Sequence, residues 1–310
     1  MKHGEVSKAA DGFQVVFNRT INHSIDKVWE ALTDPASLAQ WFTDIDMDFR
    51  VGGKITFRFR DKAKSESYGE IVSIEPPHKF VYTWEGELAT WELDEEGTNK
   101  CNLRLTYQRL SQDYAANVPA GFHTLLNRLE ASLNGIRTYY AFGSDEADPE
   151  QKKLQMEYGV FIHQLYPDLE TFKPVKIEKL INAPREKIWH ALTRKEEMKS
   201  WYFEVSDFKP QVGFKFTFSG KGSKGEDYVH HCEVTQVIPL QLLQYTWEYA
   251  NHPGYSVVTF TLHDDNGNTL VTVEHRGLET FPQTNSDFNK KSFIGGWTEL
   301  ITKLLPNYAE

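Results

Sequence analysis

The chain has 310 residues, of which 40% are hydrophobic and 25% charged, and its formal net charge is −10. No apolar run approaches the roughly 18 residues of a membrane-spanning helix, and no secretory signal follows the N-terminus. The acidic balance disfavours binding to nucleic acid and anionic lipid, so we expect a cytoplasmic protein without a nucleic-acid partner or membrane insertion.

An internal repeat organises the chain. Residues 19–33 align without gaps to residues 179–193, with identical residues at several positions such as Trp29 and Trp189. The same alignment pairs Trp41 with Trp201 and Gly53 with Gly213. After small shifts, the further matches are Tyr82-Thr83-Trp84 with Tyr245-Thr246-Trp247, and Gly121-Phe122 with Gly296-Trp297. The chain therefore contains one long domain in two tandem copies.

The two copies predict the same order of elements. A strand over 13–22 opens the first copy, and a strand over 176–182 opens the second. A short helix follows, which Ser24 can cap and which carries apolar residues at one-face spacing. A second short helix then begins at Asp34-Pro35 and ends near Trp41.

The middle of each copy alternates between apolar and polar residues, as strands do. In the first copy Ile55, Phe57 and Phe59 share one face. The segment 265–268, Asp-Asn-Gly-Asn, is a hairpin signal, and the Gly-rich segment 220–225 indicates a hairpin loop. A long amphipathic helix closes each copy, over 119–140 and over 286–305.

A connecting helix is predicted between the copies. Residues 148–166 begin with a helix-start signature, Asp148-Pro149-Glu150, and carry an apolar series. A flexible linker would lack this stripe, so we expect the helix to pack on one domain.

Several short segments in these elements match the sequence pattern of a known protein family. They are Ile21-Asn22, the segment from Lys27 to Asp34, Trp41-Phe42, Gly52-Gly53 and Tyr82-Thr83-Trp84. With these features each copy resembles the activator-of-heat-shock-ATPase-homologue family, within the SRPBCC or START-like helix-grip superfamily.

The resemblance implies an α+β fold with two tandem helix-grip domains. Each would be a curved antiparallel sheet, of about six or seven strands, wrapped around a long C-terminal helix. We expect the first domain over 1–145, the connecting helix and linker over 146–173, and the second domain over 174–310. The resemblance also implies a cavity between sheet and helix, in which superfamily members bind lipids, hormones or polyketides, and a few catalyse cyclisation or hydrolysis.

Strand alternation and the helix stripe select the residues expected to face these cavities. The candidate ligand-binding residues are Tyr82, Trp84, Trp91, Tyr107, Phe122, Tyr245, Trp247, Phe260, His275 and Trp297. Aromatic walls with a few polar tips suit an apolar or aromatic ligand. The alternative for each ring is ordinary core packing.

Two histidine positions invite a chemical interpretation. His275 shares strand parity with two valines and should point inward, where it could orient a ligand, act as an acid or base, or be a satisfied core residue. His230-His231-Cys232-Glu233 does not predict a metal site, since adjacent strand residues face opposite ways and leave two ligands at most.

The cysteines, Cys101 and Cys232, predict no disulfide.

We therefore expect a small-molecule-binding protein, without a cofactor or bound metal, that holds an apolar or aromatic ligand. No nucleophile, phosphate-binding or metalloprotease motif is present in the sequence, so a binding role is favoured over catalysis. One alternative is a cyclase or hydrolase that uses His275 with Tyr245. The other is a chaperone-associated protein of stress response, although the family's co-chaperones carry a separate chaperone-binding domain and both halves here are of helix-grip type.

Overall fold

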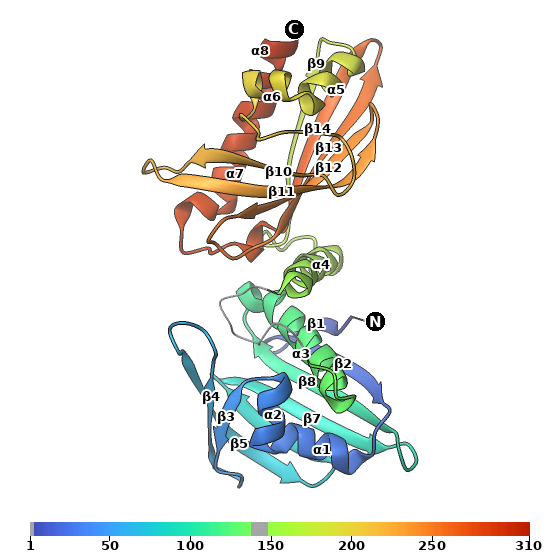
Figure 1. The fold of residues 1–310 in the computed structure, drawn as a ribbon, viewed down its shortest axis with the longest axis vertical. Helices are drawn as coiled ribbons and strands as arrows, with labels where there is room; N and C mark the ends of the chain where they lie inside the picture. The colour runs from blue at the N-terminus through green and yellow to red at the C-terminus, as the bar shows by residue number, and fades with distance from the viewer. Residues whose placement is uncertain (1–2, 138–147) are drawn as a thin grey trace. The chain divides into compact units, whose positions relative to one another are not determined.

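The computed structural model describes residues 3–137 and 148–310, and the chain forms two compact units, Met1–Tyr158 and Gly159–Glu310 (Figure 1). The division falls inside helix α4 (Pro149–Leu165), which lies where the sequence predicts a connecting helix. The first long helix, predicted over 119–140, ends at Leu133, so its prediction is too long: residues 134–137 are not helical. Residues 138–140 and the predicted boundary at 145–146 lie outside the described residues.

The first unit is an antiparallel sheet with helices on one side (Figure 1). Its strands are β1 (Glu5–Ala9), β2 (Gly12–Ile21), β3 (Asp44–Met47), β4 (Lys54–Arg58), β5 (Glu66–Glu75), β6 (Lys79–Trp84), β7 (Glu87–Glu95) and β8 (Cys101–Leu110). Its helices, besides the start of α4, are α1 (Ile25–Thr33), α2 (Pro35–Trp41) and α3 (Asn117–Leu133). Ser24 caps α1, as predicted, by accepting a hydrogen bond from Lys27 N at 3.4 Å.

The sheet of the first unit has eight strands among the described residues, in the order β1-β2-β8-β7-β6-β5-β4-β3. The sequence predicts about six or seven. One addition is β1, which pairs with β2 across a turn at Gly12 and buries Val6. The other is β3, a short edge strand that pairs with β4. The β1 segment does not alternate between apolar and polar residues, and the β3 segment alternates over only four residues, which is a weak strand signal.

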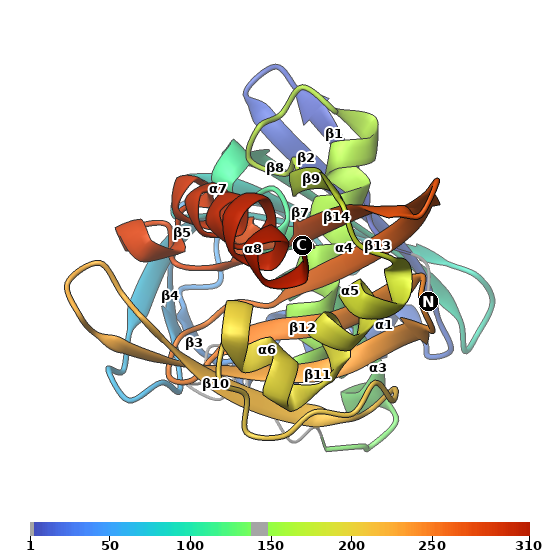
Figure 2. The same cartoon turned by 90° about the horizontal axis from the view of Figure 1, so that it is seen from above.

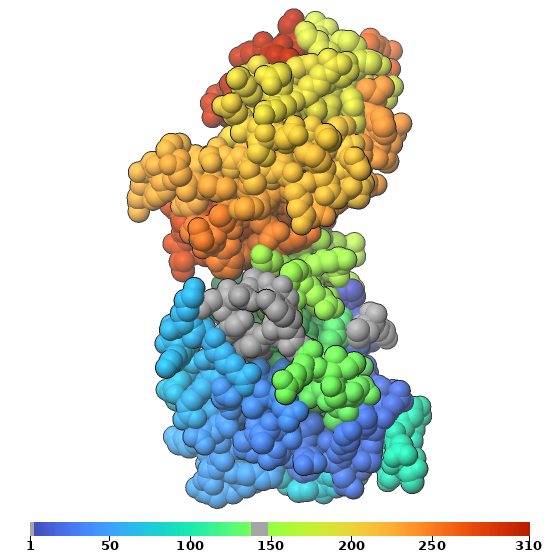
Figure 3. Space-filling view, viewed as in Figure 1, coloured from blue at the N-terminus to red at the C-terminus, as the bar shows by residue number. Residues whose placement is uncertain are grey.

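The second unit repeats this arrangement with six described strands, in the order β10-β11-β12-β13-β14-β9. They are β9 (Val175–Ile181), β10 (Lys215–Lys221), β11 (Asp227–Ile238), β12 (Leu242–Tyr249), β13 (Ser256–Asp265) and β14 (Asn268–Arg276). The β10–β11 hairpin projects from the surface of its unit (Figures 1 and 3). The Asn266-Gly267 turn between β13 and β14 has positive φ at both residues, as the hairpin signal predicts.

The helices of the second unit are α5 (Arg185–Thr193), α6 (Lys195–Trp201), α7 (Lys290–Glu299) and α8 (Leu305–Ala309). A π-helical turn, Leu300–Leu304, joins α7 to α8, so that the two form one continuous rod (Figure 2). This rod takes the place of the long helix predicted over 286–305, whose first residues form a separate 3-10 turn, Ser286–Phe288. Phe293, Trp297 and Ile301 bury its inner face.

The internal repeat holds in three dimensions, with one correction of register. Gly52 donates its N–H to Ile71 O, and Gly213 donates to Val234 O, and both glycines have positive φ. Gly213 therefore corresponds to Gly52, and the sequence match with Gly53 is wrong by one residue. The shift arises between the second short helix and this turn, where the second copy carries one residue more.

No helix in the described part of the chain is long and apolar enough to span a membrane. Cys101 and Cys232 are both free and buried.

Candidate functional site

The second unit contains a cavity of about 440 Å³ between α7 and strands β10, β11 and β12. Its walls are rich in aromatic residues, and the Phe, Tyr and Trp rings that line it are Phe203, Tyr228, Trp247, Tyr249, Phe288, Phe293 and Trp297. This volume falls within the roughly 300 to 1,000 Å³ of small-molecule sites.

A glycine in α7 borders this cavity at the surface of the unit. Gly296 lines the cavity, and nothing lies within 4 Å of the position that a Cβ would occupy there. Glycine inside a helix costs about 1 kcal/mol relative to alanine. The neighbouring Gly295 has equal space around its Cβ position but does not line the cavity. A replacement at Gly295 can therefore serve as the control for the same replacement at Gly296.

Of the five candidates predicted in the second unit, Trp247 and Trp297 line this cavity. Tyr245, Phe260 and His275 point inward but lie in the core behind it. The Tyr245 hydroxyl is hydrogen-bonded to the Tyr202 hydroxyl at 2.9 Å, and burial raises the pKa of Tyr245 well above its ordinary value.

His275 has both ring nitrogens occupied. Trp297 Nε1 donates to His275 Nδ1 at 3.0 Å, and because an indole can only donate, we assign the proton of His275 to Nε2. Nε2 then donates to Ser256 Oγ at 2.8 Å, and Ser256 donates to Trp247 O at 3.1 Å. Burial lowers the pKa of His275 to about 3, so the ring is neutral near pH 7. This hydrogen-bond chain fixes Trp297 and Trp247 in the cavity wall.

His230 is a cavity residue that the sequence interpretation missed. Its ring stacks on Phe218 at a centroid distance of 4.2 Å, and its Nδ1 lies 3.3 Å from Phe218 O. Burial lowers the pKa of His230 to about 4. Strand alternation could have identified it, since His230, Cys232 and Val234 are all buried on one face of β11, whereas His231 is exposed.

Polar groups gather at the rim of the same cavity. Asp287 accepts hydrogen bonds from Ser223 N at 3.2 Å and from the Tyr228 hydroxyl at 3.2 Å. Hydrogen bonding by the Ser223 side chain is the main reason that the pKa of Asp287 lies below its ordinary value, and the Ser223 N–H adds to this effect. Ser223 belongs to the Gly-rich hairpin loop, which is thereby tied to the 3-10 turn before α7.

The first unit has a smaller cavity, of about 250 Å³, at the corresponding place. Three predicted residues, Trp84, Tyr107 and Phe122, line it, together with Gly121. Tyr107 donates its hydroxyl to Glu87 Oε2 at 2.8 Å, and burial of Glu87 raises the pKa of this carboxyl.

Helix α4 also contributes to this first cavity, through Gln151 and Gln155. The buried ion pair Arg128–Asp148, at 2.8 Å, holds the start of the helix against α3. Tyr158 accepts a hydrogen bond from Gly4 N at 2.7 Å further along the helix.

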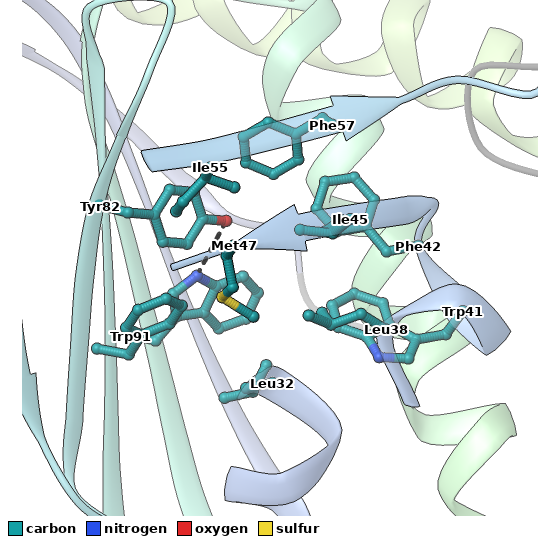
Figure 4. Close-up of a pocket in the computed structure, with 11 residues that line it drawn as sticks. Leu32, Leu38, Trp41, Phe42, Ile45, Met47, Ile55, Phe57, Tyr82 and Trp91 are labelled. Carbon is teal, nitrogen blue, oxygen red and sulfur yellow. Dashed lines mark hydrogen bonds between the residues drawn. The ribbon is translucent and has the colours of Figure 1, made fainter. Parts of the chain in front are cut away.

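The remaining predicted residues, Tyr82 and Trp91, line a third space in the first unit (Figure 4). Trp91 Nε1 donates to the Tyr82 hydroxyl at 3.4 Å. The space measures only about 20 Å³, which is room for about one water molecule. The sequence could not separate these two rings from Trp84 and Tyr107, because all four share the inward strand face.

Metal ligands do not gather anywhere in residues 3–137 and 148–310, where no group of three or more His, Cys, Asp and Glu side chains converges.

Comparison with known families decides the relationship. The family model described as activator of Hsp90 ATPase homolog 1-like protein matches residues 22–134 and 182–309, which together span more than half of the chain. The chain belongs to this family. The two matched segments fall one in each unit, so this activator-like family domain occurs here in tandem, as the sequence predicts.

Several solved structures are similar to this family member. CalU16 from Micromonospora echinospora is 23% identical over 53% of this chain and 98% of its own, with a TM-score of 0.42. DynU16, a protein of the dynemicin biosynthetic locus, is 18% identical over 97% of this chain and 98% of its own, with a TM-score of 0.38. Protein BH1534 of Bacillus halodurans is 26% identical over 44% of this chain and 96% of its own, with a TM-score of 0.36. No curated protein sequence matches the chain significantly.

Proposed function

We propose that the protein binds a small apolar or aromatic molecule in the cavity of its second unit. The observation that carries this proposal is the cavity itself, about 440 Å³ in volume and walled by aromatic rings. Such walls favour a flat apolar ligand through burial of its surface and through ring–ring contacts. The buried free thiols, Cys101 and Cys232, support action in a reducing compartment such as the cytoplasm.

The first unit is proposed to have a mainly structural role. Its cavity of about 250 Å³ lies below the usual range for ligand sites. The packing of α4 against this unit, through Arg128–Asp148 and Tyr158, also suits a scaffold.

Catalysis by His275 with Tyr245 has less support. A general acid or base must be able to exchange a proton with a substrate. Both nitrogens of His275 are engaged by Trp297 and Ser256, and the Tyr245 hydroxyl is engaged by Tyr202. We therefore favour binding over a cyclase or hydrolase activity of this pair.

A chaperone-associated role is the second candidate, and the description of the family favours it. It predicts co-purification with the heat-shock chaperone and a changed ATPase rate of that chaperone, and neither result needs an open cavity. A Gly296→Phe variant separates the two functions, because it places a ring at the cavity and changes the surface of the unit at this one position only.

The test of the proposed function is native mass spectrometry of the protein purified from its own host under gentle conditions. We expect a mass excess that corresponds to a small organic molecule and that disappears in the Gly296→Phe variant. A bare mass, together with no binding of naphthalene-type probes to the purified chain, would contradict the proposal.

A further inference from the structure

A tryptophan at the same place in both units has different partners. Trp84 and Trp247 are the last matched residues of the repeated Tyr-Thr-Trp segments. In the first unit Trp84 Nε1 donates to Ser67 Oγ at 2.7 Å. In the second unit Trp247 is buried, and its Nε1 has no hydrogen-bond partner among the described residues.

The strand register identifies the residue that replaces Ser67. Ile71 pairs with Tyr82 in the first unit, and Val234 pairs with Tyr245 in the second. On the neighbouring strand Phe57 pairs with Ser67, and Phe218 pairs with His230. Both pairings place His230 at the position of Ser67. The second unit thus carries an imidazole where the first carries the hydroxyl that satisfies the tryptophan.

His230 does not satisfy Trp247, because its ring is turned to the backbone. Its Nδ1 faces Phe218 O, and since a carbonyl can only accept, we assign the ring proton to Nδ1. The backbone of Tyr228 also interacts with this ring, and like the Phe218 carbonyl it favours an N–H of His230. On this assignment Nε2 carries the lone pair, and no contact of Nε2 with hydrogen-bond geometry occurs among the described residues. His230 is 4% exposed and lines the cavity, and its ring lies 4.7 Å from the Trp247 ring between centroids.

The nearest alternative partner for Trp247 is the Tyr249 hydroxyl. Burial raises the pKa of Tyr249, and the Trp247 indole is near enough to offset part of this rise. The contact between the Trp247 indole and the Tyr249 hydroxyl does not have the geometry of a hydrogen bond. Trp247 Nε1 therefore remains without a partner among the described residues. The wall of the cavity thus presents one buried donor without a partner, Trp247 Nε1, and one acceptor, His230 Nε2, that is open to a ligand. Leaving a buried donor unsatisfied is costly, so a ligand that satisfies Trp247 is favoured.

The charge of these groups limits the ligand further. A neutral His230 offers no positive charge to a carboxylate or phosphate ligand. Asp287 adds a negative charge at the rim, where Lys221 is already paired with Asp227 at 2.7 Å. A neutral hydroxyl suits both the Trp247 donor and the His230 acceptor, because its oxygen can accept and its proton can be donated.

We propose that the second cavity selects aromatic ligands that carry a neutral hydroxyl group, such as phenols, with the ligand hydroxyl donating to His230 Nε2 and turned toward Trp247 Nε1. This inference rests on the proposed function and names the ligand class of the same cavity. The first unit lacks this selectivity, because Ser67 already satisfies Trp84.

The test compares three probes by titration of the full chain, with tryptophan fluorescence or calorimetry as the readout. 2-Naphthol can donate and accept, 2-methoxynaphthalene can only accept, and naphthalene can do neither. One net hydrogen bond is worth up to about tenfold in affinity. We therefore expect 2-naphthol to bind roughly fivefold to tenfold more tightly than either of the other two probes.

Variants assign the selectivity to His230. His230→Phe should keep the stack on Phe218 and lose the preference for 2-naphthol, measured as the ratio of 2-naphthol to naphthalene affinity within that variant. His230→Ser copies the first unit and should lose the preference in the same way, so it replaces His230→Phe if that variant does not fold. His231→Phe is the control on the exposed face of the same strand and should keep the preference.

The outcomes separate this inference from the proposed function. Equal affinity for the three probes, or a preference that survives both His230 variants, would overturn the inference and leave aromatic binding intact. If no probe binds, the proposed function fails, and the inference fails with it.

Discussion

Replacement of Gly296 by phenylalanine tests whether the cavity is an empty space inside the second unit. The position lies on α7, lines the cavity and has nothing within 4 Å of its missing Cβ. A phenyl ring at Gly296 should therefore enter the cavity without displacing the backbone. Gly295→Phe is the matched control, because that ring points away from the cavity.

The stability of the two variants should differ by the burial of one ring. Both replacements gain about 0.5 kcal/mol, because phenylalanine is a better helix former than glycine. Full burial of a phenylalanine side chain is worth about 1.5 to 3 kcal/mol, and we expect about 1 to 2 kcal/mol for a ring that fills part of this space. At about 2 to 4 °C per kcal/mol for a unit of this size, Gly296→Phe should melt about 2 to 8 °C above Gly295→Phe.

The affinity for a ligand should fall in the Gly296→Phe variant, although its stability rises. The new ring occupies space that a naphthalene-type probe needs, so Gly296→Phe should bind naphthalene at least about tenfold more weakly, a loss of about 1.4 kcal/mol. Gly295→Phe should bind as the unmodified chain does. The assays are thermal melting by circular dichroism and titration by tryptophan fluorescence. The reasoning is refuted if Gly296→Phe binds naphthalene normally, or if it melts below Gly295→Phe.

Three further predictions follow from contacts in each unit. Asp148→Asn should destabilise the first unit by about 3 kcal/mol in chemical denaturation, because it leaves Arg128 buried without its ion pair, and an unchanged midpoint would show that the pair is unimportant. Ser67→Ala should lower the free energy of unfolding by about 1 kcal/mol, because it removes the hydrogen bond of the half-buried Trp84 N–H, whereas no loss would mean that water replaces the hydroxyl. The third concerns pH: the unfolded chain binds a proton at His230 near pH 6.5, whereas the folded chain binds it only near pH 4, so stability falls as pH drops through this window. Between pH 6.5 and 5 the unmodified chain should lose about 1.6 kcal/mol more than His230→Phe, and parallel pH profiles of denaturation would contradict this.

Much of the fold can be predicted from the sequence because its signals are local. Asn266-Gly267 specifies a turn by its tolerance of positive φ, and Ser24 specifies a helix start through its side-chain oxygen. The repeat supplies the domain order without any other homologue. Strand β1 pairs locally with β2 but shows no alternation in sequence, and the one-residue shift at Gly213 depends on pairing with the distant Val234, which no local pattern records.

The candidate site can be predicted only as far as the direction of side chains. Parity places His275 inward, but it cannot show that Trp297 and Ser256 occupy both ring nitrogens. Strand alternation also predicts that His230 points inward, but from the sequence we consider the segment 230–233 only as a metal site and do not select His230 as a cavity residue. Whether an inward ring lines a cavity depends on volume left elsewhere, here by Gly296, and volume is a property of the packed structure.

A crystal structure of the full chain grown with 2-naphthol would show directly whether the second cavity binds a hydroxylated aromatic ligand. We expect the naphthol ring to lie between α7 and strands β11 and β12, with the naphthol oxygen within hydrogen-bond distance of His230 Nε2. Naphthol bound elsewhere, or an empty cavity at a saturating concentration of the probe, would contradict it.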